Sequence, residues 1–367
     1  MIENFKEHIL ALKPNDATFD ALALDIFNYQ YKNNAFYRSY CTLIKKLPET
    51  VKKITDIPFL PIIFFKNHTI KTGEWIDETV FTSSGTTSRD AMLASNHHVC
   101  DISFYNKISR KGFENFYGKI ADYCILGLLP AYLERTGSSL VAMTDDFIRQ
   151  SKYPQSGFFL YDHQKLYKIL RDNQEKNIPT LLIGVTFALL DFSEELSAIS
   201  YQLSEKPNIQ NPKSKIVIME TGGMKGRRKE MIREELHEIL KKSFGVPQIH
   251  SEYGMTELLS QGYSTGNGIF APIPSMRVLL REVTDPFSIF DFRFSIFDLD
   301  DKTKNPKSKI QNPKSKTGVI NIIDLANIDT CSFIATDDLG KLYPDGTFEV
   351  LGRLDTADIR GCNLLVG

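Results

Sequence analysis

The stretch Phe81-Thr82-Ser83-Ser84-Gly85-Thr86-Thr87-Ser88-Arg89 places one glycine among a majority of hydroxyl side chains. The apolar residues 79–81 before it predict a short strand, and Ala91-Met92-Leu93-Ala94 after it predicts the start of a helix. Glycine lets the backbone approach an anion, and backbone N–H groups and hydroxyls donate hydrogen bonds to its oxygens. The stretch therefore predicts a phosphate-binding loop. An ordinary polar turn is the alternative, because the Gly-Lys-Ser/Thr ending of the P-loop does not follow.

The composition is that of a soluble globular protein. The chain has 367 residues, a formal net charge of −1, 42% hydrophobic residues and 24% charged residues. Its length allows two domains or one large α/β domain. Near-neutral charge gives no electrostatic footprint for nucleic acid. Residues 1–7 are acidic rather than apolar, and no apolar run approaches the roughly 18 residues that span a bilayer, so we expect neither a signal peptide nor a membrane span.

The cysteines are scattered and form no C-x-x-C pair. They are Cys41, Cys100, Cys124, Cys331 and Cys362. This spacing argues against a zinc site and against a disulfide framework. It predicts a protein of the reducing cytoplasm.

The order of apolar segments predicts an α/β fold. Residues 1–55 show helical periodicity, and the proline-broken run 57–65 predicts buried extended chain. Three short apolar runs, 124–129, 181–184 and 216–219, alternate with helical segments. Continuous apolar runs of this length are typical of parallel strands that are buried on both faces. We therefore expect helix-covered, mostly parallel sheets.

Two polar loops follow expected strands in this sheet. Glu220-Thr221-Gly222-Gly223 comes directly after the third apolar run, and a helix over 232–244 ends at Gly245. The chain then passes through residues 247–250 into Ser251-Glu252-Tyr253-Gly254-Met255-Thr256-Glu257. Both loops fall at the carboxyl ends of parallel strands, which is where α/β sheets place their ligands. The pair His97 and His98 has no third metal ligand nearby and predicts polar structure rather than a metal site.

Short repeats mark an insert at about 287–316. Residues 287–291 recur as 294–298, and Asn305-Pro306-Lys307-Ser308-Lys309 recurs as 312–316, with another copy at 211–215. Two copies are too few for a solenoid. We expect exposed, low-complexity sequence inserted into an older fold, with the Phe/Ile parts pairing as a hairpin. The alternative is a functional lid.

Four motifs now stand in a fixed order over roughly 270 residues. They are Ser83-Ser84-Gly85-Thr86-Thr87, Tyr253-Gly254-Met255-Thr256-Glu257, Thr336-Asp337-Asp338-Leu339 and Gly352-Arg353-Leu354-Asp355. Together they resemble the adenylate-forming superfamily of acyl-CoA synthetases, luciferases and adenylation domains. The chain length, the loop 220–223 and the terminal Arg360-Gly361-Cys362 are most similar to the fatty-acyl–protein synthetases of bacterial bioluminescence, the long-chain-fatty-acid–luciferin-component ligases.

The resemblance implies a two-step reaction that uses ATP and Mg²⁺. A carboxylate attacks the α-phosphate to give an acyl-adenylate and pyrophosphate, and the acyl group then passes to a thiol. Because two anions must meet, their charge has to be neutralised and oriented. The resemblance implies a fatty acid or another carboxylic acid as substrate and an acyl reductase or acyl-transferase protein as partner.

The resemblance also assigns roles to residues. The loop that would hold the β- and γ-phosphates consists of Ser83, Ser84, Gly85, Thr86 and Thr87. Thr256 would hydrogen-bond the α-phosphate, and Glu257 would ligate Mg²⁺, a hard cation that prefers oxygen ligands. Cys362 would be the acyl acceptor, since it lies in the segment that moves in the superfamily and Arg360 would favour its thiolate.

The adenosine contacts come from three places in the sequence. Tyr253, followed by Gly254 and Met255, would pack against the adenine, and Gly222 and Gly223 would allow close backbone approach. Asp338 would accept hydrogen bonds from the ribose. Arg353 would reach the ribose or a phosphate.

The chain departs from the superfamily pattern in three ways. Thr336-Asp337-Asp338 replaces a Thr-Gly-Asp motif, so Asp337 is an alternative ribose ligand. The segment 352–361 is one residue shorter than the usual hinge motif. The chain ends at Gly367, so we expect the mobile C-terminal domain with its lysine to be absent or truncated. The predicted organisation is an acyl-adenylate-forming domain over 1–350 and a hinge and tail over 351–367.

Two other functions remain open at this point. One is a carboxylate–CoA ligase of the phenylacetate–CoA ligase type, and the other is a non-catalytic acyl-binding relative. Single motifs also have structural explanations: Glu257 as a helix-start carboxylate, Tyr253 as core, Asp338 as a turn cap and Cys362 as a small buried residue.

Overall fold

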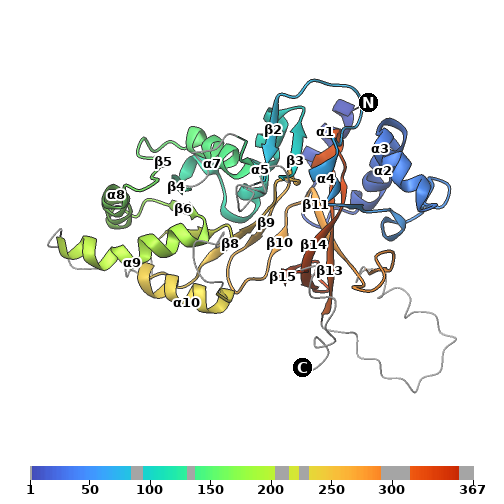
Figure 1. Ribbon diagram of the computed structural model, residues 1–367. Helices are drawn as coiled ribbons and strands as arrows, with labels where there is room; N and C mark the ends of the chain where they lie inside the picture. The colour runs from blue at the N-terminus through green and yellow to red at the C-terminus, as the bar shows by residue number, and fades with distance from the viewer. Residues whose placement is uncertain are drawn as a thin grey trace, which may run out of the picture. The chain divides into compact units, whose positions relative to one another are not determined.

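The computed structural model describes residues 2–83, 94–129, 137–202, 215–222, 231–290 and 315–354 (Figure 1). The chain forms two compact units. The first combines Met1–Phe64, Ile70–Glu74 and Pro274–Gly367, and the second combines Phe65–Thr69 and Trp75–Ile273. Both units are therefore built from segments that are far apart in the sequence.

The first unit begins with the expected helical layer. It consists of α1 (Ile2–Ala11), α2 (Phe19–Asn33), α3 (Ala35–Leu43) and the 3₁₀ turn η1 (Ile54–Asp56). Helix α2 buries Phe19, Ala23, Ile26 and Phe27 at the i, i+4, i+7, i+8 spacing of an amphipathic helix. The same stripe ends in Gln30, whose buried amide donates to the backbone carbonyl of Asn327 over 2.9 Å.

The first unit also contains a six-stranded sheet in the order β1 (Leu60–Pro61), β14 (Phe333–Leu342), β13 (Lys316–Asp324), β11 (Met276–Arg281), β12 (Ile289–Phe290), with β15 (Phe348–Arg353) on β14. A 3₁₀ turn, η4 (Leu325–Asp329), follows β13. All strand pairings in this sheet are antiparallel except that of β1 with β14. The expectation of mostly parallel strands does not extend to this sheet, because tight turns such as residues 343–347 connect neighbouring strands.

The second unit carries the predicted parallel sheet. Its strand order is β10 (Ala271–Pro272), β9 (Gly262–Ser264), β8 (His250–Tyr253), β7 (Ile216–Glu220), β6 (Thr180–Gly184), β4 (Cys124–Leu128), β5 (Gly157–Phe158). All pairings from β5 to β8 are parallel. The three apolar runs of the sequence are β4, β6 and β7, so the prediction of buried parallel strands is confirmed for this sheet.

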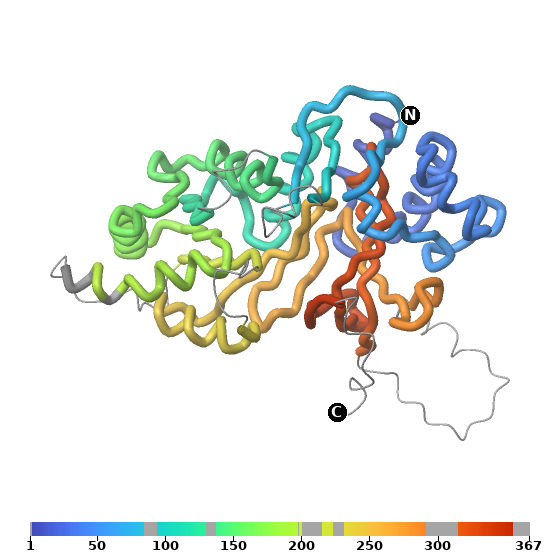
Figure 2. Tube along the Cα trace, viewed as in Figure 1, coloured from blue at the N-terminus to red at the C-terminus, as the bar shows by residue number. Residues whose placement is uncertain are grey.

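Helices cover both faces of the parallel sheet, α5 (Ile102–Tyr117) and α7 (Ser139–Gln150) on one side and α9 (Thr186–Gln202) and α10 (Arg233–Phe244) on the other (Figures 1 and 2). The unit also contains α8 (His163–Glu175), the 3₁₀ turn η3 (Ile120–Asp122) and most of the short helix α4 (Phe64–Asn67). Helix α10 ends at Gly245, which adopts the left-handed conformation (φ 62°), as the sequence predicted. The core of this layer joins Leu126, Leu182 and Ile218 of the strands to Leu170 and Leu240 of the helices.

A two-stranded hairpin brackets the hydroxyl-rich stretch. Strand β2 (Thr79–Thr82) pairs antiparallel with β3 (Asn96–Val99), and the two lie side by side in Figure 2. The strand at 79–81 is confirmed. Of the expected helix start 91–94, residues 91–93 lie outside the described residues, and Ala94 is irregular two residues before β3 begins.

The insert is narrower than its repeats imply. Ile289 and Phe290 of the first Phe/Ile copy form β12, which pairs with β11. The second copy lies outside the described residues, so a hairpin between the two copies stays a prediction. Lys316, the last residue of the expected insert, is the first residue of β13, and its ammonium lies 2.8 Å from Glu282. Residues 291–314 and the other repeat copy at 211–214 lie outside the described residues.

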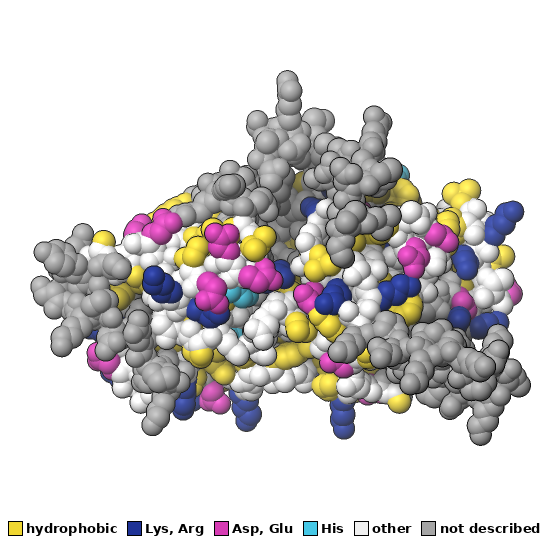
Figure 3. Space-filling view, turned by 90° about the horizontal axis from the view of Figure 1, so that it is seen from below, with side chains coloured by type: hydrophobic (Ala, Val, Ile, Leu, Met, Phe, Trp, Pro, Cys, Tyr) yellow, Lys and Arg dark blue, Asp and Glu magenta, His cyan; other side chains and the backbone are white. Residues whose placement is uncertain are grey.

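The surface carries mixed charge. On the face shown in Figure 3, acidic and basic side chains of the described residues are interspersed rather than separated by sign. Among the described residues, no helix combines the length and the apolar character needed to cross a bilayer.

Candidate active site

The two polar loops that the sequence singled out begin at one edge of the parallel sheet. Strands β7 and β8 pair in parallel, with Met219 opposite His250 and Glu220 opposite Ser251. The loop after Glu220 and the turn after Tyr253 therefore leave the sheet at neighbouring carboxyl ends. The backbone N–H of Thr221 also donates to the carbonyl of Gly184, 3.1 Å away, which ties the end of β6 to the same edge.

Glu220 is the centre of a buried polar cluster at this edge. One carboxylate oxygen accepts a hydrogen bond from the Gly222 backbone N–H over 2.7 Å. The other lies 3.7 Å from Nε of Arg233 and 3.6 Å from Nε2 of His237. Burial alone raises the pKa of Glu220, but the His237 hydrogen bond and the Arg233 charge outweigh it, so the net pKa is lowered. Glu220 is therefore an ionised, structural carboxylate that fixes Gly222.

Gly222 occupies the left-handed region (φ 74°) and bends the chain immediately after β7. A Cβ at this position would meet no atom of the described residues within 4 Å. The predicted close backbone approach at Gly222 fits this conformation but stays a prediction. Gly223 lies outside the described residues.

Tyr253 is buried at the end of β8, with 8% of its surface exposed. Its ring packs edge-on against Phe270 with centroids 5.9 Å apart, and the Arg233 guanidinium lies 5.2 Å from the centroid of the Phe270 ring. The aromatic side chain is thus held rigidly by the protein itself. Contact with an adenine stays a prediction.

The turn after β8 carries the next predicted residues. Gly254 is exposed, Met255 and Thr256 are half-buried, and Glu257 is 5% exposed. The turn closes where the Leu258 N–H donates to the Met255 carbonyl over 3.1 Å. No helix starts at Glu257, so its interpretation as a helix-start carboxylate is wrong. Thr256 and Glu257 stay predicted catalytic residues, and Glu257 stays the predicted metal ligand.

Sequence reasoning missed the contact that His97 makes with this turn. The His97 side chain on β3 is fully buried, and its Nδ1 lies 2.8 Å from the backbone carbonyl oxygen of Thr256. A carbonyl only accepts, so Nδ1 carries the proton. Burial lowers the pKa of His97 to about 4, which keeps the ring neutral. No sequence signal marks this contact, because Asn96-His97-His98-Val99 shows no apolar alternation and Thr256 lies far away in the sequence.

Ser83 is the one residue of the predicted phosphate loop that the structure describes. Its N–H donates to the Ser95 carbonyl over 3.0 Å, and its hydroxyl accepts from the Ser95 N–H over 2.8 Å. These bonds close the base of the hairpin. The predicted ligands Ser84, Gly85, Thr86 and Thr87 lie outside the described residues.

Glu252 is a second acidic residue at this edge that sequence reasoning passed over. Its carboxylate lies over Gly254, in space that a side chain at that position would occupy. Burial raises the pKa of Glu252 to about 8, and the negative charge of Glu220 adds to the shift. Perturbed carboxyl groups of this kind gather at functional sites. Nothing in the local sequence pattern signals the shift, because it arises from burial in the folded chain and from Glu220 on the neighbouring strand.

In the first unit, the predicted ribose residues lie on paired strands. Asp338 of β14 is directly opposite Arg353 of β15, which places both side chains on one face of the sheet. Asp337 belongs to the opposite face and interacts electrostatically with Arg281, whose guanidinium donates to the Thr336 carbonyl over 2.6 Å. This favours Asp338 over Asp337 as the partner of Arg353, and the contact of either with ribose stays a prediction.

The described cysteines do not supply an obvious nucleophile. Cys41, Cys124 and Cys331 are buried free thiols, and burial raises the pKa of each, for Cys41 to about 12. Cys100 is half-buried. Cys362 lies outside the described residues, as do Asp355 and Arg360.

The donor set suits Mg²⁺ held largely by phosphate and water. Among the described residues, no three His, Cys, Asp or Glu side chains converge into a metal cage. Mg²⁺ is usually bound through one or two carboxylates plus substrate phosphates, so a single carboxylate at Glu257 fits this ion.

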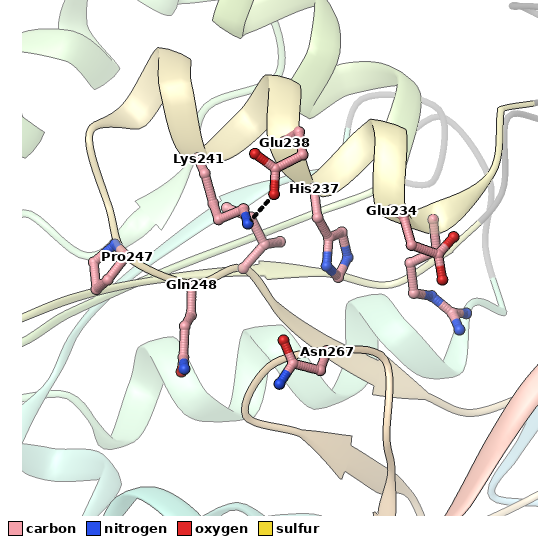
Figure 4. Close-up of a pocket in the computed structure, with 9 residues that line it drawn as sticks. Glu234, His237, Glu238, Lys241, Pro247, Gln248 and Asn267 are labelled. Atoms are coloured by element: carbon pink, nitrogen blue, oxygen red, sulfur yellow. Dashed lines mark hydrogen bonds and ion pairs between the residues drawn. The ribbon is translucent and has the colours of Figure 1, made fainter.

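A cavity of about 190 Å³ lies beside α10 (Figure 4). Helix α10 contributes Arg233, Glu234, His237, Glu238 and Lys241, and Gln248 and Asn267 also line the cavity. Lys241 pairs with Glu238, and Arg233 and His237 contact Glu220, so its charges are largely compensated. These polar walls do not suit a fatty acyl chain.

The fold is that of the adenylate-forming enzymes. A structure of 2-hydroxyisobutyryl-CoA ligase in an open conformation, in complex with 2-HIB-AMP and CoA, aligns with 92% of this chain and 75% of its own at a TM-score of 0.57 and 11% identity. A second structure of that ligase, in the postadenylation state, aligns with 94% of this chain and 69% of its own at the same TM-score and identity.

The sequence narrows the class to a family. The acyl-protein synthetase (LuxE) family matches residues 9–268, which is more than two thirds of the 367 residues. The chain therefore belongs to this family. The long-chain-fatty-acid–luciferin-component ligase of Photorhabdus luminescens is 39% identical over 66 residues, which are 18% of this chain and 56% of that protein. The alignment thus spans about half the length of this relative.

Proposed function

We propose that this protein is an AMP-forming acid–thiol ligase, a fatty-acid–protein ligase of the reducing cytoplasm. It activates a fatty acid with ATP as an acyl-adenylate and transfers the acyl group to a cysteine thiol. The observation that carries the proposal is the convergence of Gly222, Tyr253 and the Thr256–Glu257 turn at the carboxyl ends of adjacent parallel strands. Membership of the acyl-protein synthetase family supports it.

The first step joins two anions, a carboxylate and the α-phosphate of ATP. In the proposal, the Thr256 hydroxyl donates to an α-phosphate oxygen and Ser83 to Thr87 hold the terminal phosphates. Glu257 would hold Mg²⁺, which supplies positive charge to the phosphates when bound. Preorganised groups stabilise charge that develops in the transition state without reorganising. The bonds from His97 to the Thr256 carbonyl and from Gly222 to Glu220 support such preorganisation, because they hold the backbone around these residues in place.

The residues proposed to bind the adenosine part of ATP are those that the family resemblance assigns. Tyr253, Gly254 and Met255 are proposed to contact the adenine, with Gly222 and Gly223 allowing close approach. Asp338 and Arg353 are proposed to contact the ribose. The fixed position of the Tyr253 ring against Phe270 supports an aromatic surface that loses little entropy on binding.

The second step transfers the acyl group to Cys362. The thiolate sulfur attacks the acyl carbonyl carbon, the bond to the phosphate oxygen breaks, AMP leaves with the electron pair, and the thiol proton passes to solvent. The raised pKa values of the buried thiols Cys41, Cys124 and Cys331 disfavour them as nucleophiles. An acyl reductase or acyl-transferase protein is the proposed recipient of the thioester.

The proposal is tested by ATP–pyrophosphate exchange over a panel of carboxylic acids of increasing chain length. We expect exchange that depends on Mg²⁺ and is greatest with medium or long fatty acids. Exchange with none of the acids would contradict the proposal and favour a non-catalytic acyl-binding protein.

The acceptor is tested with labelled fatty acid and the variant Cys362→Ser. We expect this variant to keep exchange and to lose the hydroxylamine-labile label on the protein. Label on another cysteine would remove Cys362 from the mechanism. Thioester formation on free CoA instead of protein would favour a carboxylate–CoA ligase.

A further inference from the structure

His97 is placed as a structural link within the second unit. Its side chain is fully buried, it lies opposite Phe81 in the β2–β3 pairing, and its ring packs edge-on against Phe65 with centroids 5.8 Å apart. These contacts leave the imidazole little freedom to rotate. The direction of its Nδ1–H bond is therefore fixed by the hairpin.

The acceptor of that bond is a particular peptide group. The carbonyl oxygen of Thr256, 2.8 Å from Nδ1, belongs to the planar peptide that joins Thr256 to Glu257. Holding this plane fixes ψ of Thr256 and φ of Glu257 together. The directions in which the hydroxyl and the carboxylate leave the backbone then depend on one hydrogen bond.

The turn that contains this peptide is irregular. It continues into neither a helix nor a strand before Gly262, and its main-chain closure is the bond from Leu258 to Met255. The 2.8 Å bond from a rigid, buried donor therefore ties this peptide plane to the hairpin.

We propose that His97 is a positioning residue for the reaction. Its Nδ1–H orients the Thr256–Glu257 peptide, and through it the two side chains that act on ATP. This inference rests on the proposed function and names a residue that acts through Thr256 without touching substrate. The same hydrogen bond also holds the β2–β3 hairpin, which brackets the hydroxyl-rich stretch, in a fixed position relative to the Thr256–Glu257 turn.

The chain supplies matched variants for a test. Asn places an amide N–H near the position of Nδ1, whereas Gln places it near Nε2, so His97→Asn keeps the donor and His97→Gln moves it. His97→Leu removes it. His98 is the control, because it is the next residue of β3 and its Nδ1 lies 2.9 Å from Asp77, away from the turn.

The readouts are ATP–pyrophosphate exchange with the preferred fatty acid, separated into kcat and KM for ATP, and the Mg²⁺ concentration for half-maximal rate. A misplacement of about 1 Å costs on the order of 100-fold in rate. We expect His97→Leu and His97→Gln to lower kcat by about 10- to 100-fold and to raise the Mg²⁺ requirement. We expect His97→Asn to retain rates within about threefold, and His98→Asn to match the wild-type protein.

Each outcome decides the matter. Equal kcat in His97→Asn and His97→Gln overturns the inference, and this comparison holds even where His97→Leu does not fold. A ¹⁵N NMR spectrum of the imidazole showing the proton on Nε2 also overturns it, independently of activity. Wild-type protein without exchange contradicts the proposed function and, with it, the role of His97. Active wild-type protein with unaffected variants contradicts the role of His97 alone.

Discussion

Three glutamates at one sheet edge differ in what surrounds each carboxylate. Glu220 is ionised because His237, Arg233 and the Gly222 N–H stabilise its charge. For Glu252, on the neighbouring strand, burial and the negative charge of Glu220 raise the pKa to about 8. Residues of one type thus take different protonation states, and only Glu257 stands in the turn that leads to the predicted phosphates.

Replacement of Glu257 by alanine is expected to reduce ATP–pyrophosphate exchange by at least about 100-fold. Removing the carboxylate that would hold the metal leaves phosphate repulsion uncompensated in the transition state. The measurement is the exchange rate at saturating ATP. Glu235→Ala, an exposed position on α10, is the control for loss of a glutamate charge. Wild-type exchange in Glu257→Ala would remove Glu257 from the site.

Glu252 makes a pH-dependent contribution to stability. Its folded pKa is raised from 4.5 to about 8, so the unfolded state loses its proton first. This contribution is complete below pH 4.5 and is lost as pH rises through about 8. Glu252→Gln mimics the protonated acid, so we expect it to unfold at a higher temperature than wild type at pH 9 and at a similar one at pH 4.5. Equal melting temperatures at pH 9 would show that Glu252 is not buried in the neutral form.

At the scale of elements, the β2–β3 hairpin depends on a close backbone approach at Gly137. The Thr82 N–H donates to the Gly137 carbonyl over 2.7 Å, and a Cβ on Gly137 would lie 2.7 Å from the carbonyl oxygen of Val80. Gly137 also has φ +87°, a conformation that L side chains rarely adopt. A side chain here must push β2 away.

Gly137→Ala is therefore expected to destabilise the protein by more than the roughly 1–3 kcal/mol that backbone strain alone costs. Gly118→Ala is the matched control, because Gly118 has φ +83° but open space around its Cβ. Chemical denaturation measures the free energy of unfolding of both variants, and the difference between them isolates the steric clash from the backbone strain that both share. An equal loss of free energy of unfolding in the two variants would contradict the proposed contact.

The repeat-bearing segment offers a test at the same scale. Excision of residues 301–314 is expected to leave the free energy of unfolding unchanged within about 2 kcal/mol, because loop-closure cost depends weakly on length. The deletion stops before Lys316, which pairs with Leu342 in β13 and lies 4.2 Å over the Phe290 ring. Thermal and denaturant unfolding measure the effect. A larger loss would show that the excised residues pack.

Across the whole molecule, the sequence patterns predicted the features that depend on residues close together in the chain. The buried strands β4, β6 and β7 were visible as apolar runs, and their parallel order followed from the helices between them. The position of the candidate site, at the carboxyl ends of the parallel strands, was predicted from the two polar loops that follow those strands. The left-handed Gly245 that ends α10 was likewise visible in the sequence.

The remaining features depend on contacts between distant segments. The β2–β3 pairing was missed because the polar run Asn96-His97-His98-Val99 lacks a strand signature. The antiparallel sheet of the first unit joins β1 to β14, which are more than 270 residues apart. The His97–Thr256 bond spans 159 residues, and the pKa of Glu252 depends on a neighbouring strand. No local pattern carries such information.

The central claim is that the protein forms an acyl-adenylate, and direct detection of that intermediate tests it. The full-length protein is mixed with Mg²⁺, ATP labelled at the α-phosphate and a long-chain fatty acid, quenched in acid, and resolved by chromatography and mass spectrometry. We expect fatty acyl-AMP in amounts that approach the protein concentration, together with pyrophosphate, and at least about 100-fold less from Glu257→Ala. ATP that remains intact, or that yields ADP and phosphate with no acyl-AMP, would contradict the account.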